Sequence, residues 1–189
     1  IGVESGDSVT TATGSVLIGH RSGAGLTTNG RNVFIGDFAG DAATVSASVI
    51  IGADAGGGNL SGHGNVFIGE RAGASVTSGK LNVIMGTAAG RLISSGENNT
   101  IVGFASGEAI TTALDNALFG YATGFKMTGA QNTLLGSKAG GAITSGADNI
   151  AIGYNAANGT GNNITGQKNV IVGNEAASSL SSGEKNVII

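Results

Sequence analysis

The residue types that most often carry out catalysis or bind metals are scarce and scattered in this chain. There is no cysteine, and His20 and His63 are the only histidines. The sequence contains no His-Glu-x-x-His pair, no phosphate-binding loop and no nucleophile elbow. We therefore expect no catalytic residue, no metal site and no cofactor, and we predict that the protein is not an enzyme.

Two sets of side chains could bind a ligand without catalysing a reaction. Phe104, Tyr121 and Tyr154 each follow a glycine at the same point of a repeat, so they could form an edge on which the sugar rings of a glycan stack. Packing within loops is the alternative. Hydroxyl pairs such as Thr10-Thr11 and Thr111-Thr112 also recur. They allow an ice-binding surface, but adjacent residues should not both face outward, and hydrogen bonding in turns is the simpler interpretation.

These residues lie on a repeat that runs through the whole chain. A clear copy is Asn65-Val66-Phe67-Ile68-Gly69, followed by Ala72-Gly73. The intervals between motif glycines are 17 residues, apart from two of 16 and one of 20. The glycines are Gly2, Gly19, Gly36, Gly52, Gly69, Gly86, Gly103, Gly120, Gly136, Gly153 and Gly173. This period is too short for a helical hairpin or a propeller blade, and it is typical of one coil of a β-solenoid.

Each position of the repeat has a recognisable role. Three apolar residues form a short strand that the motif glycine ends, the Ala-Gly pair allows a bend, and an aliphatic residue seven after the glycine fills the opposite wall. An asparagine four residues before the glycine could form an amide ladder along the stack. The predicted ladder comprises Asn32, Asn65, Asn82, Asn99, Asn116, Asn132, Asn149, Asn169 and Asn186. We predict an all-β, single-stack parallel β-solenoid, a β-roll or β-helix, of about eleven 17-residue coils.

The repeat predicts one continuous domain over residues 1–189, with a local insertion near 155–163 that we interpret as a surface bulge. The chain opens on Ile1-Gly2, inside a motif, so we expect it to be a segment of a longer protein. Its formal charge of −3 argues against nucleic acid as a partner. No apolar run is long enough for a membrane helix, and we expect no direct membrane insertion. The position two after the glycine forms no acidic column, which argues against ordered calcium sites.

The middle residue of each three-residue strand is apolar, and so are its two neighbours. Strands that are apolar throughout are usually buried on both faces, whereas one coil has a single inside. We therefore predict that Val66 and Ile68 build the core of the coil and that Phe67 faces a neighbouring chain. The predicted assembly stripe is Leu17, Phe34, Ile50, Phe67, Ile84, Ile101, Leu118, Leu134, Ile171 and Ile188, with Ala151 in the same column. It predicts side-by-side association, with a homotrimer as the natural closed arrangement. The alternative is a flattened coil whose own far wall covers both faces.

The repeat resembles two groups of extracellular repeats. Asn149-Ile150-Ala151-Ile152-Gly153 is similar to the coils of trimeric autotransporter adhesin heads, although those coils are usually shorter. The segment from Asn132 to Gly140 is similar to the Asn-Thr-x-Ile-Gly-x-x-Ala-Gly repeat of phage tail fibres and bacterial surface proteins. The resemblance implies homotrimeric solenoids that bind a surface or hold a binding tip away from it. We accordingly expect an extracellular, cell-surface or virion location and a structural or adhesive role, with a cell-surface glycan or receptor as a possible partner.

Overall fold

The computed structural model of the chain describes residues 1–159, 161 and 163–189. In this part of the chain there are eleven short parallel strands and no helix. The strands are β1 (Val16–Ile18), β2 (Val33–Ile35), β3 (Val49–Ile51), β4 (Val66–Ile68), β5 (Val83–Met85), β6 (Thr100–Val102), β7 (Ala117–Phe119), β8 (Thr133–Leu135), β9 (Ile150–Ile152), β10 (Val170–Val172) and β11 (Val187–Ile188). All of them belong to one sheet, in which they follow the order of the sequence.

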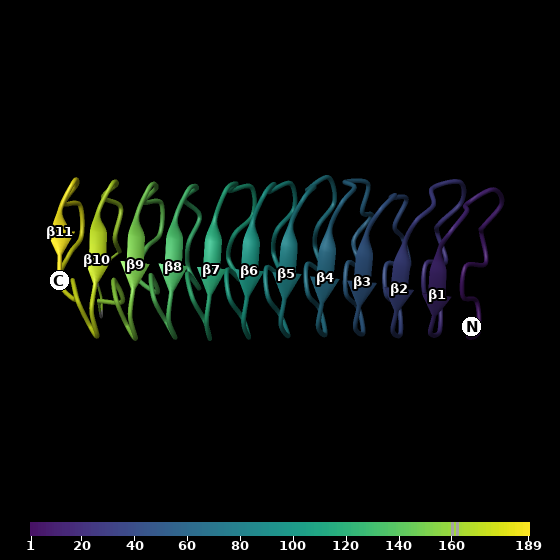
Figure 1. Cartoon of the computed structure of the whole chain (residues 1–189), viewed down its shortest axis with the longest axis horizontal. Helices are drawn as coiled ribbons and strands as arrows, with labels where there is room; N and C mark the ends of the chain where they lie inside the picture. Colours follow the sequence, from purple (N-terminus) through teal and green to yellow (C-terminus); the bar gives the residue numbers. More distant parts are fainter. Residues whose placement is uncertain (160, 162) are drawn as a thin grey trace.

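The sheet is one wall of a rod in which the chain winds round once between successive strands. Each strand pairs with the next in register, so that Phe67 of β4 lies beside Ile84 of β5. The pairing continues from β9 to β10 across the longest repeat, with Ala151 beside Ile171. Figure 1 shows the strands side by side along the rod, with the two ends of the chain at opposite ends. The predicted parallel β-solenoid is confirmed, with about 10 turns.

Three columns of side chains fill the interior of the rod. The middle residue of each strand from β2 to β10, such as Phe67 or Ile84, is completely buried. So is the alanine three residues after the motif glycine, as in Ala72, and the aliphatic residue seven after it, as in Val76. Each column comes from a different side of the coil, and together they form one continuous hydrophobic core. Each wall of the coil therefore contributes a single layer of side chains to the core.

The prediction that the middle residues face a neighbouring chain is wrong. Phe34, Ile50, Phe67, Ile84, Ile101, Leu118, Leu134, Ala151 and Ile171 are all fully buried within their own coils. Leu17 and Ile188, in the terminal strands, are half-buried and pack against the same core. Since side chains alternate along a strand, the two outer residues of each strand point away from the core. Val66 and Ile68 thus face outward, and Phe67 faces inward.

The coil turns its corners with backbone in the left-handed region. The motif glycine has a φ near that of Gly86, which is 132°. A Cβ on Gly86 would lie 2.5 Å from the carbonyl oxygen of Gly103 in the next turn, so only glycine fits there. Three further positions of the coil have φ of about 50° to 70°, and non-glycine residues such as Arg71 and Leu81 occupy two of them in most turns. Successive turns thus approach one another closely where the strand ends.

Candidate functional site

The outward surface of the sheet runs along the whole rod and is open to solvent. We call it the outer sheet face and define it as the first and third residue of each strand, together with Ile189 after β11. These positions are Val16, Ile18, Val33, Ile35, Val49, Ile51, Val66, Ile68, Val83, Met85, Thr100, Val102, Ala117, Phe119, Thr133, Leu135, Ile150, Ile152, Val170, Val172, Val187 and Ile189. All are half-buried or exposed in the single chain, and all but Thr100 and Thr133 are apolar.

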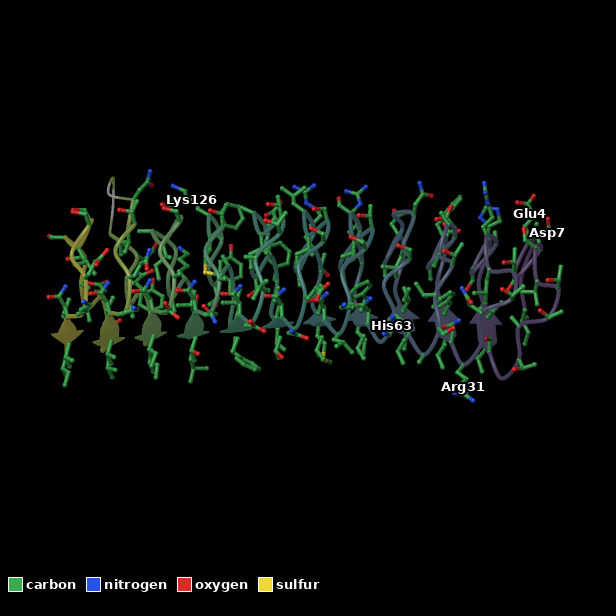
Figure 2. The ribbon with its side chains drawn as sticks, turned by 90° about the horizontal axis from the view of Figure 1, so that it is seen from above. Glu4, Asp7, Arg31, His63 and Lys126 are labelled. Atoms are coloured by element: carbon green, nitrogen blue, oxygen red, sulfur yellow. The ribbon has the colours of Figure 1, made fainter. Side chains whose placement is uncertain are left out.

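An exposed column borders the outer sheet face on each side. The residue directly before the buried asparagine is exposed in most turns and includes Arg31, Asp115 and Lys168. The residue directly after the motif glycine is also exposed in most turns, and this column mixes Asp37 and Glu70 with aromatic and aliphatic residues. Figure 2 shows side chains projecting from the strands away from the body of the rod, with Arg31 on that side. The arrangement is an apolar strip whose charged margin is interrupted by aromatic and aliphatic residues.

The predicted asparagine ladder is present inside the rod. The Nδ2 of Asn82 donates hydrogen bonds to the Oδ1 of Asn65 at 3.2 Å and to the carbonyl of Gly96 at 2.8 Å. The backbone N–H of Asn82 donates to the same Oδ1 at 3.0 Å. Asn99 repeats this pattern on Asn82, with Nδ2 to Oδ1 also at 3.0 Å. Each amide thus ties its own coil to the next and satisfies backbone groups that would otherwise be buried without partners.

Serine replaces asparagine in the ladder at Ser15 and Ser48. The hydroxyl of Ser48 accepts the backbone N–H of Asn65 at 3.3 Å. The N–H of Ser48 in turn donates to the Oδ1 of Asn32 at 3.0 Å. The serine hydroxyl therefore still accepts a hydrogen bond from the backbone N–H of the next turn. It has no Nδ2 and cannot make the side-chain amide contact that asparagine makes, as between Asn82 and Asn65. The ladder is a structural device of the core and is closed to ligands.

The three aromatic residues that sequence analysis put on one edge are all about half exposed, Phe104 at 52%, Tyr121 at 51% and Tyr154 at 51%. Phe104 and Tyr121 come from successive turns, and their rings stack with centroids 5.6 Å apart and planes 7° from parallel. Tyr154 lies two turns beyond Tyr121, with Ser137 at the intervening position. The structure thus brings two of the three rings together and leaves the third separated by one turn.

Both histidines are exposed. The Nδ1 of His20 lies 2.9 Å from the Oδ1 of Asp37 in the next turn, and the His20 ring meets Phe38 edge-on at 4.9 Å. Among residues 1–159, 161 and 163–189, no three His, Cys, Asp or Glu side chains gather where they could hold a metal ion. His20 and Asp37 form an isolated polar pair at a corner of the coil.

The hydroxyl residues differ in part from expectation. Both members of the pairs Thr10-Thr11 and Thr111-Thr112 are exposed, although only one of each was expected to face outward. The reason is that these residues lie in a turn, where side chains do not alternate as in a strand. The first hydroxyl of several pairs donates to a carbonyl of the next turn, as from Thr77 to Ser94 at 3.1 Å. Those hydroxyl groups already donate their hydrogen bonds within the rod.

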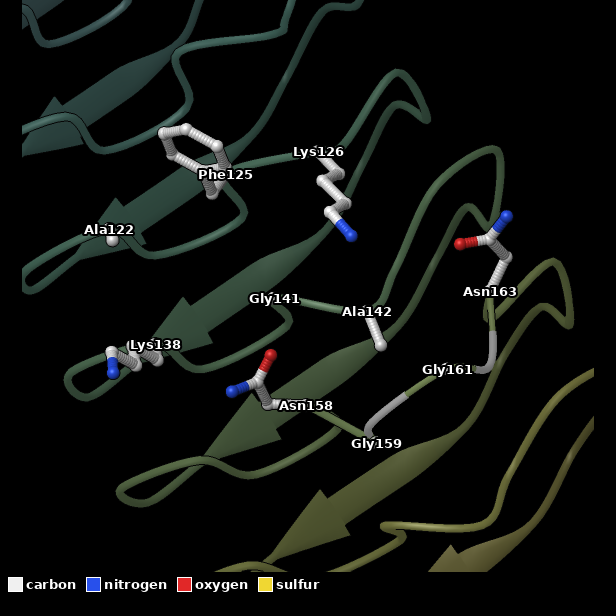
Figure 3. Close-up of a pocket in the computed structure, with 10 residues that line it drawn as sticks. All are labelled: Ala122, Phe125, Lys126, Lys138, Gly141, Ala142, Asn158, Gly159, Gly161 and Asn163. Atoms are coloured by element: carbon white, nitrogen blue, oxygen red, sulfur yellow. The ribbon is translucent and has the colours of Figure 1, made fainter.

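A hollow of about 520 Å³ lies beside the predicted insertion. Its lining comes from three successive turns and includes Phe125, Lys126, Lys138, Asn158 and Asn163. Figure 3 shows Lys126 and Asn163 on opposite sides of the open space and Asn158 below it. Residues 160 and 162 of the insertion lie outside the described residues. Sequence reasoning located the insertion but treated it as a surface bulge, and so it missed the hollow.

Comparison with known proteins found no matching protein family, no matching curated protein and no matching solved structure. Within the part of the chain that the structure describes, no helical segment has the length and hydropathy needed to cross a lipid bilayer. The candidate sites are the outer sheet face, the aromatic edge and the hollow.

Proposed function

We propose that the chain is a non-catalytic segment of an extracellular fibre, in which copies associate side by side as a parallel homotrimer. Its role would be structural or adhesive, as in a phage tail fibre or a bacterial surface adhesin. The observation that carries the proposal is the outer sheet face, because an apolar strip along the whole rod is far more regular than scattered surface hydrophobic residues. The resemblance of the repeat to fibre and adhesin repeats supports the same role.

The size of the outer sheet face suits the apolar centre of an interface rather than a whole interface. Eleven strands about 4.8 Å apart give a length on the order of 50 Å, and three residues per strand give a width of roughly 10 Å. The resulting strip of about 500 Å² is near the upper end for an ordinary monomer surface. A typical interface buries about 800 Å² per partner, with an apolar centre and a polar rim. The strip would supply the centre, and the charged margin would supply the rim.

The two-column form of the strip favours three copies around an axis parallel to the rods. In that arrangement the first residue of each strand, such as Val66, faces one neighbour, and the third, such as Ile68, faces the other. All three rods then point the same way, as a fibre requires. The middle residues stay within their own coils, so each rod keeps its own core. The outer sheet faces of the three rods would form a second core around the three-fold axis.

Native mass spectrometry and sedimentation equilibrium test the assembly. One chain has a mass of 18.2 kDa, so the trimer is expected at about 55 kDa, which is three times that value. A particle of the monomer mass at micromolar concentration would contradict self-association. A stable dimer would retain the interface but contradict the three-fold arrangement.

A second candidate function, recognition of a glycan, is favoured by the stacked pair of Phe104 and Tyr121. Exposed aromatic rings present apolar surface to sugar rings, and here two half-exposed rings stack on each other at the edge of the rod. Tyr154 could contact a more distant unit of the same glycan. An ice-binding role has less support, because hydroxyls such as that of Thr77 are hydrogen-bonded within the rod.

A glycan array distinguishes adhesion from pure scaffolding. We expect Tyr121→Ala to lower the signal of any bound glycan by about 10-fold, since one stacking contact contributes roughly 1 kcal/mol or more. Thr87→Ala is the matched control, because Thr87 is exposed at the same position of the repeat one turn before Phe104. Equal signals from the wild-type protein and Tyr121→Ala would exclude the aromatic edge as the binding surface.

A further inference from the structure

We propose that the hollow beside the insertion binds an acidic monosaccharide unit, a sugar ring that carries a carboxylate. This site goes beyond the fibre role and does not use the outer sheet face. It lies at the longest repeat of the chain. In a molecule built from nearly identical turns, a local departure of this kind is where a specific ligand site is expected.

The register of the turns explains why there is a hollow. Ile164 forms a parallel bridge with Ile143 on the wall opposite the sheet. Gly140 also donates its N–H to the carbonyl of Ala156 at 2.7 Å. In the sequence, residues 158–163 therefore stand between these two contacts, where the preceding turn has only Gly141 and Ala142. Gly141 and Ala142 thus present almost no side chain to the hollow, opposite Asn158 and Asn163.

Small residues keep the floor of the hollow open. Gly141 has no side chain, which lets the Oδ1 of Asn158 lie where a Cβ would otherwise stand. Ala142 is buried and contributes only a methyl group. In the turn before, the equivalent positions carry Phe125 and Lys126, which form a raised border. The volume of about 520 Å³ lies within the range of small-molecule sites and is ample for one sugar ring.

The charge of the lining is positive, although the chain as a whole has a formal charge of −3. Lys126 and Lys138 both line the hollow, and no carboxylate does among the described residues. The ion pairs found in that part of the chain use other cations, such as Arg91, which pairs with Glu108 at 2.6 Å. The two ammonium groups are thus available to an anionic ligand. In Figure 3 the Lys126 side chain extends from the border toward the open space.

The remaining lining matches a sugar ring better than a bare anion. Phe125 is 41% exposed and offers an apolar surface next to Lys126. The Nδ2 of Asn158 donates to the Oδ1 of Asn155 at 2.9 Å, which fixes the amide and leaves its Oδ1 to accept from a ligand hydroxyl. Asn163 supplies a second amide. A carboxylate on lysine, an apolar ring face on Phe125 and hydroxyls on the amides together describe a uronic acid.

Isothermal titration calorimetry with glucuronate, glucose and inorganic phosphate tests the proposal on the full chain. We expect glucuronate to bind at least about 10-fold more tightly than glucose, which lacks the carboxylate, or phosphate, which lacks the ring. Lys126→Gln should weaken glucuronate by about 10-fold or more, since a hydrogen bond to a charged group is lost. Lys168→Gln removes an exposed lysine at another corner of the coil and should leave the affinity unchanged.

Each other outcome overturns the proposal. Absence of binding for all three probes excludes the site, equal affinity for phosphate reduces it to a general anion site, and equal affinity for glucose removes the role of the charge. Because Lys126 is exposed, its variant should keep the circular dichroism spectrum and thermal midpoint of the wild-type protein. A charged variant of the outer sheet face, Ile68→Glu, should bind glucuronate normally, which separates failure of this site from failure of the proposed assembly.

Discussion

At the scale of single residues, the fold depends on backbone that most side chains avoid. The motif glycine adopts φ values such as 132° at Gly86, and it lies against the backbone of the next turn. Other corners place ordinary residues in the left-handed region, as at Arg71 and Leu81. Each such residue costs about 1–2 kcal/mol relative to a right-handed conformation. The stacked core and the hydrogen bonds between turns must offset that cost in every coil.

We expect Gly86→Ala to destabilise the rod by at least about 3 kcal/mol, because it combines backbone strain with a collision. The new Cβ would lie 2.5 Å from the carbonyl oxygen of Gly103. Gly14→Ala separates the two effects, since Gly14 has a φ of 67° and no atom within 4 Å of its added Cβ. It should cost only about 1 kcal/mol. Urea denaturation at one protein concentration measures both, and equal losses would contradict the steric explanation.

At the scale of the element, each short strand contributes to two different surfaces, the core of the rod and the outer sheet face. Its middle residue and the preceding asparagine point inward, as Phe67 and Asn65 do, and its outer residues form the outer sheet face. The strand pairs with its neighbours through the backbone, while the asparagine adds side-chain hydrogen bonds beside that pairing. A strand of only three residues is therefore fixed in register by its polar neighbour as much as by its own backbone.

Removal of one ladder amide tests this role. We expect Asn82→Ala to lower the free energy of unfolding by about 2–4 kcal/mol, because the N–H of Asn99 and the carbonyl of Gly96 lose their side-chain partner. Asn82→Ser should cost less, since a serine hydroxyl can accept the N–H of the next turn as Ser48 does for Asn65. Thermal denaturation of the two variants provides the comparison. An alanine variant as stable as the serine variant would show that the ladder contributes little.

The orientation of the strand could have been predicted from two features of the sequence. The asparagine lies two residues before the middle residue, and in a strand these two positions share a face. Thr100 and Thr133 occur at the first strand position, whereas the middle column contains only apolar residues. Continuous hydrophobicity suggested burial on both faces but did not identify which face was inside. The period, by contrast, was sufficient for the solenoid and for the asparagine ladder.

The hollow could be located in the sequence but not described from it. The interval of 20 residues between Gly153 and Gly173 marks the irregular turn. The lining, however, combines Phe125 and Lys126 from one turn with Gly141 and Asn158 from the next two. Whether an insertion stands out as a bulge or encloses a space depends on the size of side chains one and two turns away. That information becomes available only once the turns are stacked.

At the scale of the whole molecule, the outer sheet face determines how a rod meets other rods. We expect Ile68→Glu to convert the proposed trimer of about 55 kDa to monomers of 18.2 kDa with an unchanged circular dichroism spectrum. The three-fold arrangement would bring three like charges together in an apolar interface, which is costly. Phe67→Glu, at the adjacent inward position, should instead unfold the chain because it buries an unpaired charge. Sedimentation equilibrium distinguishes the two, and a trimeric Ile68→Glu variant would contradict the interface.

The register of the sheet, in which each strand contacts only the strands of adjacent turns, has a mechanical consequence. Under tension applied to the two ends, the load would act on one turn at a time. The turns would unfold one after another, starting from an end of the rod. Each released turn of 17 residues would lengthen the chain by roughly 55 Å, the extended length less the rise of one turn. Such a filament would dissipate mechanical energy in equal steps of extension. Packing against neighbouring rods would raise the force needed for each step.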